Sequence, residues 1–160
     1  MILIEEDFLN HQTCDELIQM YQNSETSFGT YRDIYVKNLF CIDRKASLQM
    51  GIIFTSYLAA RGVQVYPELI QAAVWPEGAT QAIHIDKART TTALTSITYL
   101  NDNFEGGETY FENGTSVKPK KGKTVFFDGM KYPHGVHPVR NGKRFVLANW
   151  YSKDIENLYI

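Results

Sequence analysis

The sequence of 160 residues lacks several features that mark special classes of protein. It has only two cysteines, Cys14 and Cys41, which cannot form a disulfide framework, and we expect both thiols to be buried in a reducing compartment. No apolar run approaches the ~18 residues that a membrane span needs. The N-terminal segment MILIEEDFLNH carries acids where a secretion signal carries basic residues. These absences predict a soluble, cytoplasmic protein with no membrane partner.

The sequence also has little net charge, a formal −2 at pH 7. Such a balance gives no general attraction to nucleic acid or to a membrane surface. The charge is unevenly spread, because residues 117–145 hold eight Lys/Arg and one acid, a local +7 that leaves −9 for the remainder. This segment suits an acidic peptide, a nucleic-acid backbone or simply a solvated basic face. No second cluster of arginines follows His134, which argues against nucleic acid.

The length suits one domain, and neither repeats nor linkers divide the chain. The composition is 44% hydrophobic and 13% aromatic, which is typical of a globular protein rich in strands. The pattern changes near residue 62. We therefore expect a single domain over residues 1–160, with a helical support in 1–62 and a β-region in 63–160.

Two helices are expected before residue 62. Thr13-Cys-Asp-Glu16 has the form of a capping box, and Cys14, Leu17, Ile18 and Tyr21 follow at helical spacing. The second helix is expected from about Arg44 to Arg61, where Gly62 suits a helix end. Its apolar stripe consists of Ala46, Met50, Ile53 and Tyr57.

Short strands separated by turn signals are expected after Gly62. Asn113-Gly114 and Asn141-Gly142 are typical of tight turns between strands. About eight strands behind two helices indicate a mainly β protein with flanking helices (α+β), a double-stranded β-helix or jelly roll with both helices packed on one sheet. The expected strands are 69–75, 82–87, 92–100, 108–112, 115–117, 123–127, 135–139 and 143–151.

His84 and Asp86 stand two residues apart in an expected strand. They therefore point to the same face and present an imidazole beside a carboxylate. With a second histidine from a distant strand, the set becomes two histidines and one carboxylate, which suits non-haem Fe(II) with open coordination positions. Alone, the His-x-Asp triplet also fits a surface ion pair, and a fourth protein ligand would indicate structural zinc instead.

Arg144 begins an alternating strand in which Arg144, Val146, Ala148 and Trp150 share one face. A guanidinium among apolar neighbours on an inward face requires an anionic partner, because an unpaired buried charge is costly. A dicarboxylate would supply a bidentate partner. The alternative is an outward-facing strand end with a partner at the surface.

Residues from about Gln71 to Trp150 resemble the Fe(II)/2-oxoglutarate-dependent dioxygenases, in particular the prolyl 4-hydroxylase-like branch. The similarity covers about half the chain and keeps the order of the family's motifs. The matching segments are His84-Ile-Asp86, Arg89, Thr95, Tyr99-Leu-Asn101, Phe104-Glu-Gly-Gly-Glu-Thr109, Phe111, Val117-Lys-Pro119, Gly122, Phe126-Phe127, His134-Gly-Val-His-Pro-Val139, Gly142-Lys-Arg144 and Trp150.

The resemblance implies roles for individual residues. The iron ligands would be His84, Asp86 and His134, with His134 preferred over His137 because of its place ahead of the Pro-Val pair and its distance from Arg144. Arg144 would bind the far carboxylate of 2-oxoglutarate, with Lys143 as the fallback. The other members of the cosubstrate pocket would be Tyr99, Thr95 and Trp150.

The resemblance further implies hydroxylation of a C–H bond, in the first place prolyl 4-hydroxylation of a peptide or protein, with Fe(II), 2-oxoglutarate, O₂ and ascorbate as a reductant. Relatives usually have tyrosines nine and three residues before the first iron histidine, where this chain has Trp75 and Gln81. That departure leaves the substrate open. The alternatives are the same chemistry on a free amino acid or other small molecule, and a non-catalytic jelly-roll binding module.

Overall fold

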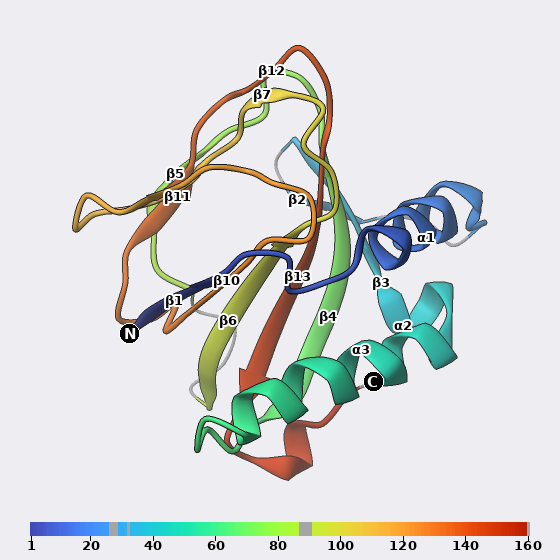
Figure 1. The fold of residues 1–160 in the computed structure, drawn as a ribbon, viewed down its shortest axis with the longest axis vertical. Coiled ribbons are helices and arrows are strands. Elements are labelled where there is room, and N and C mark those ends of the chain that lie inside the picture. Colours follow the sequence, from blue (N-terminus) through green and yellow to red (C-terminus); the bar gives the residue numbers. More distant parts are fainter. Residues whose placement is uncertain (26–28, 32, 87–90, 160) are drawn as a thin grey trace.

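The chain forms two facing β-layers with the helices on the outer side of the larger layer, as the computed structural model in Figure 1 shows. The structure describes residues 1–25, 29–31, 33–86 and 91–159. The larger sheet has seven antiparallel strands, which are, in spatial order, β1 (Ile2–Glu5), β10 (Thr124–Phe127), β6 (Thr92–Tyr99), β13 (Arg144–Ser152), β4 (Tyr66–Trp75), β3 (Ile34–Asn38) and β2 (Gly29–Tyr31).

The smaller layer faces this main sheet. It contains a four-stranded sheet of β5 (Gln81–His84), β11 (His134–Val136), β8 (Thr109–Phe111) and β9 (Ser116–Val117), and a two-stranded sheet of β12 (Val139–Arg140) and β7 (Glu105–Gly106). Asn141 and Gly142, both with positive φ, connect β12 to β13, as the Asn-Gly pair predicts. The two layers confirm the expected jelly roll.

The helices are α1 (His11–Asn23), α2 (Leu39–Ile42), α3 (Arg44–Ala59) and the 3₁₀ turn η1 (Ile155–Asn157). The capping box predicted at Thr13 is wrong, because the N-cap of α1 is Asn10, three residues earlier, whose side chain accepts the N–H of Thr13. Gly62 has a φ of 76° and closes α3 with Val63, whose N–H donates to the carbonyl of Leu58. No helix in the described ranges is long and apolar enough to span a membrane.

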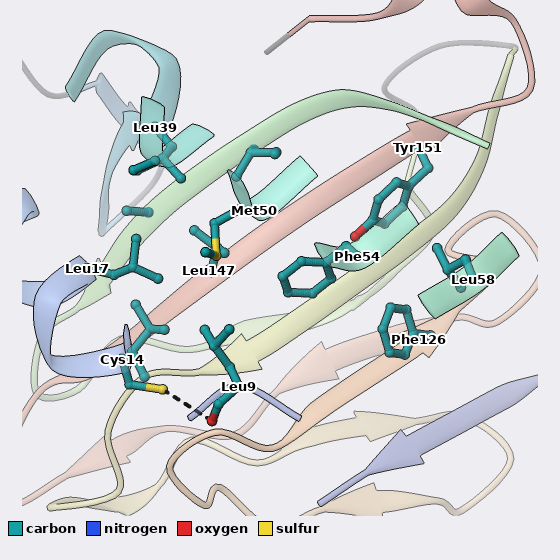
Figure 2. Close-up of a cluster of buried hydrophobic side chains, with 14 of the residues drawn as sticks. Leu9, Cys14, Leu17, Leu39, Met50, Phe54, Leu58, Phe126, Leu147 and Tyr151 are labelled. Carbon is teal, nitrogen blue, oxygen red and sulfur yellow. Dashed lines mark hydrogen bonds between the residues drawn. The ribbon is translucent and has the colours of Figure 1, made fainter. Parts of the chain in front are cut away.

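Alternation along the main sheet divides its side chains between two cores. Leu147 and Tyr151 of β13 face the helices, where they pack with Phe54 and Leu58 of α3 and with Cys14 of α1 (Figure 2). The opposite face of the same sheet looks into the space between the two layers. The two helices therefore pack on one side of the main sheet, as expected, and leave the other side to form an internal site.

Four details differ from the sequence-based expectations. The first 62 residues contribute β1, β2 and β3 to the main sheet as well as the helices. Ile53 is 41% exposed, and Phe54 takes its place in the buried stripe of α3. Cys14 is buried as expected, but Cys41 is exposed. The strand expected over 82–87 ends at His84, and Lys87 lies outside the described residues.

Candidate active site

Strand pairing brings His84 and His134 together, although fifty residues separate them in the sequence. The two residues are direct partners on the antiparallel strands β5 and β11, and their ring centroids lie 4.5 Å apart. Asp86 follows β5 and places its Oδ1 3.6 Å from Nε2 of His84 and 3.5 Å from Nε2 of His134. One ligand atom from each residue lies within 4.8 Å of the others, so the three can hold a single metal ion.

Both imidazoles are oriented for metal binding by backbone carbonyls. Nδ1 of His84 lies 2.9 Å from the carbonyl oxygen of Ala82, and Nδ1 of His134 lies 2.8 Å from that of Tyr132. Because a carbonyl oxygen only accepts, each Nδ1 carries a proton, and the other ring nitrogen, Nε2, faces Asp86. Two imidazoles and one carboxylate, with no fourth protein ligand in the described cluster, fit Fe(II) better than a closed zinc site.

The two oxygens of Asp86 have different partners. Oδ1 faces the histidines, whereas Oδ2 accepts hydrogen bonds from the hydroxyl of Thr95 at 2.7 Å and from the indole N–H of Trp150 at 3.3 Å. Burial alone would raise the pKa of the Asp86 carboxyl, but hydrogen bonds from His134, His84 and Thr95 outweigh it and hold the pKa well below its usual range. Asp86 is therefore an oriented, ionised ligand.

Gly129 leaves room for this carboxylate. Its carbonyl accepts the N–H of Asp86 at 2.9 Å, and a Cβ built at position 129 would lie 2.2 Å from Oδ2 of Asp86 and 2.8 Å from Oγ1 of Thr95. Any larger residue would push the ligand out of place. The sequence gives no sign of this role, because the glycine is adjacent to Asp86 only through tertiary contact.

A cavity of about 860 Å³ between the two layers contains the three metal-ligand candidates and Arg144. The expected alternation on β13 is confirmed, because Arg144, Val146, Ala148 and Trp150 all line this cavity. Arg144 is only 1% exposed. An outward-facing strand end is therefore wrong for Arg144, and Lys143, the fallback, is the exposed neighbour.

The Arg144 guanidinium is held at one end of the cavity by neutral partners. Nε donates to the carbonyl of Gly107 at 2.9 Å, Nη2 donates to the hydroxyl of Thr109 at 3.2 Å, and the group lies over the ring of Trp75 at 4.7 Å. None of the described carboxylates forms an ion pair with it, and burial lowers the pKa of the Arg144 guanidinium. The charge of Glu108 acts on the guanidinium without an ion-pair contact, and a buried cation with no described carboxylate at ion-pair distance suits an anionic ligand.

The other three predicted cosubstrate residues do not share one environment. They are Thr95, Tyr99 and Trp150. Thr95 and Trp150 line the cavity, and their polar atoms contact Asp86. Tyr99 is fully buried but is not among the lining residues, and its hydroxyl lies 2.7 Å from that of Thr109. Thr109, which sequence reasoning missed, joins Tyr99 to Arg144, and its inward place on β8 was the available signal.

Several other residues are also placed by the structure. Trp75 and Gln81, which stand where relatives have tyrosines, both line the cavity. His137 is exposed and stacks on Tyr110 with ring centroids 4.0 Å apart, outside the cavity lining. His11 is an exposed residue at the start of α1. Arg89 lies outside the described residues.

The basic segment 117–145 is partly neutralised in space. Lys121 pairs with Asp15 at 2.6 Å, and Lys123 pairs with Glu6 at 3.3 Å. Acids of the first sixteen residues therefore offset two of its lysines. This pairing weakens the case for a nucleic-acid surface there.

Comparison with known proteins agrees with this geometry. The sequence profile of the 2OG-Fe(II) oxygenase superfamily matches residues 70–152, just over half of the chain. Human prolyl 3-hydroxylase 2 is 41% identical over 66 residues, which are 37% of this chain and 9% of that protein. Human prolyl 3-hydroxylase 3 is 39% identical over 61 residues, 34% of this chain and 8% of that protein. The chain thus spans about a tenth of the length of these curated relatives.

Solved structures share the fold at low sequence identity. The viral collagen prolyl hydroxylase of Paramecium bursaria Chlorella virus-1, solved with 2OG, has a TM-score of 0.75 and 22% identity over 94% of each chain. A Pseudomonas putida prolyl-4-hydroxylase has a TM-score of 0.78 and 19% identity over 96% of this chain and 92% of that one. A Trichoplax adhaerens prolyl hydroxylase in complex with a peptide fragment has a TM-score of 0.76 and 20% identity over 98% and 85%. With the metal-ligand triad and the buried arginine in one cavity, the chain belongs to the 2OG-Fe(II) oxygenase superfamily.

Proposed function

We propose that this protein is an Fe(II)- and 2-oxoglutarate-dependent dioxygenase that hydroxylates prolyl residues of a peptide or protein. The observation that carries the proposal is the shared cavity, in which His84, Asp86 and His134 converge at one end and Arg144 lies buried at the other. The prolyl preference is supported by the names of the relatives and of the structures with the same fold.

Each residue has a defined task in this proposal. His84, Asp86 and His134 would hold Fe(II) through Nε2, Oδ1 and Nε2, and their carbonyl and hydroxyl partners keep those atoms aimed at one point. Arg144, positioned by Thr109 and Gly107, would pair with the far carboxylate of 2-oxoglutarate. When bound, the iron and cosubstrate supply oxidative chemistry that converts 2-oxoglutarate and O₂ into succinate, CO₂ and one oxygen atom inserted into a substrate C–H bond.

The cavity itself favours this chemistry. Apolar side chains from both layers make up most of its lining. We include three further points in the proposal. Residues 1–160 form one domain, supported by a main sheet that takes strands from both 1–62 and 63–160. A reducing, cytoplasmic location is supported by two cysteines that form no disulfide. Ascorbate is expected to sustain turnover by keeping iron ferrous.

The test is a coupled measurement of succinate and of substrate mass. Purified protein with Fe(II), 2-oxoglutarate, O₂ and ascorbate should produce succinate and add 16 mass units, the mass of one oxygen atom, to proline-containing peptides in an array that also carries lysine and asparagine peptides. Chromatography of hydrolysed product against 3- and 4-hydroxyproline standards decides the ring position. His134→Ala should abolish both signals. Full turnover by His134→Ala would dismiss the site, and succinate formation with no modified peptide would redirect the proposal to a small-molecule substrate.

A further inference from the structure

Part of the cavity lies beyond the metal-ligand candidates and Arg144, along β3 and β4. Its wall there is apolar and consists of Ile34 and Val36 of β3 with Leu69 and Ala73 of β4. Gln71 of β4 is the uncharged amide set within this wall. Two other polar lining residues, Thr95 and Trp150, are bonded to Asp86, whereas the hydrogen bond of Gln71 goes to Asn38. Gln71 therefore has no part in holding the metal or Arg144.

Strand register places Gln71 toward the metal end of the cavity. Gln71 pairs with Ala148 on β13, two residues from Trp150, whose indole contacts Asp86. Arg144 pairs instead with Trp75, four residues along β4 from Gln71. At roughly 3.3 Å per residue, that separation is about 13 Å along the strand. The Gln71 side chain thus lies away from the end where Arg144 would anchor the cosubstrate.

A neighbouring amide fixes the orientation of Gln71. Nε2 of Gln71 donates to Oδ1 of Asn38, its register partner on β3, at 3.1 Å. Once Nε2 is committed to this bond, Oε1 remains as the acceptor of the amide. Within the described part of the chain, no donor is bonded to Oε1. The pair presents a preset hydrogen-bond acceptor on an otherwise apolar wall.

An extended peptide lying against such a wall would bury main-chain N–H groups, and each one left without a partner weakens binding. We infer that Oε1 of Gln71 accepts a hydrogen bond from a main-chain N–H of the substrate and so selects a peptide over a free amino acid. This inference rests on the proposed function. Proline has no main-chain N–H, so the donor belongs to a residue next to the prolyl target.

The test separates peptide recognition from cosubstrate binding. Gln71→Met keeps the length of the side chain but removes the acceptor, Gln71→Glu keeps an acceptor, and Gln49→Met on the exposed side of α3 is the matched control. The probe is a fluorescein-labelled ten-residue peptide with one central proline that the wild type hydroxylates. Its binding is followed by anisotropy with Mn²⁺ in place of Fe²⁺, with 2-oxoglutarate and without O₂, so that no turnover occurs.

Gln71→Met should raise the peptide Kd and KM about tenfold and leave the Kd for 2-oxoglutarate within about twofold of wild type, whereas Gln71→Glu and Gln49→Met should bind the peptide nearly normally. A second set of peptides replaces one main-chain N–H at a time with an ester oxygen. One of these peptides should bind the wild type more weakly by a similar factor, because it lacks the N–H that Gln71 accepts. The same peptide should bind Gln71→Met no more weakly than the unmodified peptide does. An unchanged peptide Kd in Gln71→Met, or an equal loss of 2-oxoglutarate affinity, overturns the inference alone. A wild type that turns over 2-oxoglutarate yet hydroxylates only free amino acids overturns the inference together with the peptide part of the proposed function.

Discussion

Replacing Arg144 with methionine should separate cosubstrate binding from folding. The guanidinium is 1% exposed, and its hydrogen bonds go to neutral acceptors, the Gly107 carbonyl and the Thr109 hydroxyl. If a cosubstrate carboxylate binds at this site, replacing Arg144 removes one partner of a buried charge pair. Such truncations cost about 2–5 kcal/mol, so the Kd for 2-oxoglutarate should rise by at least about thirtyfold in Arg144→Met.

Folding stability should respond very differently. The substitution loses two hydrogen bonds from a charged donor, each worth about 1.5–3 kcal/mol, and the contact over Trp75 at 4.7 Å. It also removes the desolvation penalty of a buried ion, which amounts to several kcal/mol. These effects oppose each other, so the free energy of unfolding without cosubstrate should stay within about 2 kcal/mol of wild type.

Calorimetric titration of the Mn²⁺-loaded protein with 2-oxoglutarate gives the Kd, and urea unfolding of the metal-free protein gives the stability. Arg140→Met, which removes an exposed arginine from β12, is the control and should change neither. A normal Kd in Arg144→Met would refute the anion-binding role. A loss of more than 4 kcal/mol in stability would show instead that the guanidinium is a structural group.

The remaining predictions concern the carboxylate ligand and the thiols. Thr95→Val and Trp150→Phe each remove one donor to Oδ2 of Asp86 and should weaken Co²⁺ binding about 10–100-fold in a visible-absorption titration; unaltered affinity in both would contradict the role of these donors. Gly129→Ala should lower Co²⁺ affinity although all three metal-ligand residues are kept, since the alanine Cβ would lie 2.2 Å from Oδ2 of Asp86. An affinity equal to wild type would show that the backbone at residue 129 shifts to make room. Burial raises the pKa of the Cys14 thiol to about 11. At pH 8 a thiol reagent should therefore modify the exposed Cys41 quickly and Cys14 only in denaturant. Fast modification of both thiols would refute the burial of Cys14.

The fold could be predicted where local pattern and tertiary environment agree. The strands of the C-terminal half alternate clearly, and the structure places β4, β6, β10 and β13 close to their expected ranges. Strand β2, at one edge of the main sheet, and its neighbour β3 were not predicted, because the segment after α1 has many polar residues. β3 is held by its partner β4 and by contacts that a local pattern does not carry, such as the bonds from Nζ of Lys37 to the carbonyls of Tyr21 and Ser24.

The candidate site likewise has parts that the local sequence pattern predicts and parts that depend on tertiary contacts. Period-two alternation places Arg144 on the face of Trp150, and this placement is confirmed. His84 and Asp86 also lie side by side as predicted, but Asp86 stands beyond the end of β5, so strand alternation is not what brings them together. The fifty-residue jump to His134 rested on resemblance, because strand register cannot be calculated from one sequence. Gly129 was missed for the same reason, since it acts through a contact made only after the layers close. Thr109 was missed as a site residue although its inward place on β8 was a signal for it.

Knowing which face of a strand a residue occupies does not tell which group in the cavity its side chain contacts, as the predicted cosubstrate pocket shows. Thr95 and Trp150 stand opposite each other on β6 and β13, and both reach the same oxygen of Asp86. Tyr99 stands on the same strand as Thr95, yet its hydroxyl meets Thr109 beside Arg144. Two residues on one face of β6 thus act at opposite ends of the cavity. Thr95 contacts the metal ligand Asp86, and Tyr99 contacts Thr109, which is bonded to the buried cation Arg144. A substitution at Thr95 should therefore change metal affinity first, and one at Tyr99 should change 2-oxoglutarate affinity through Thr109 and Arg144, although the sequence alone assigns both residues to the same pocket.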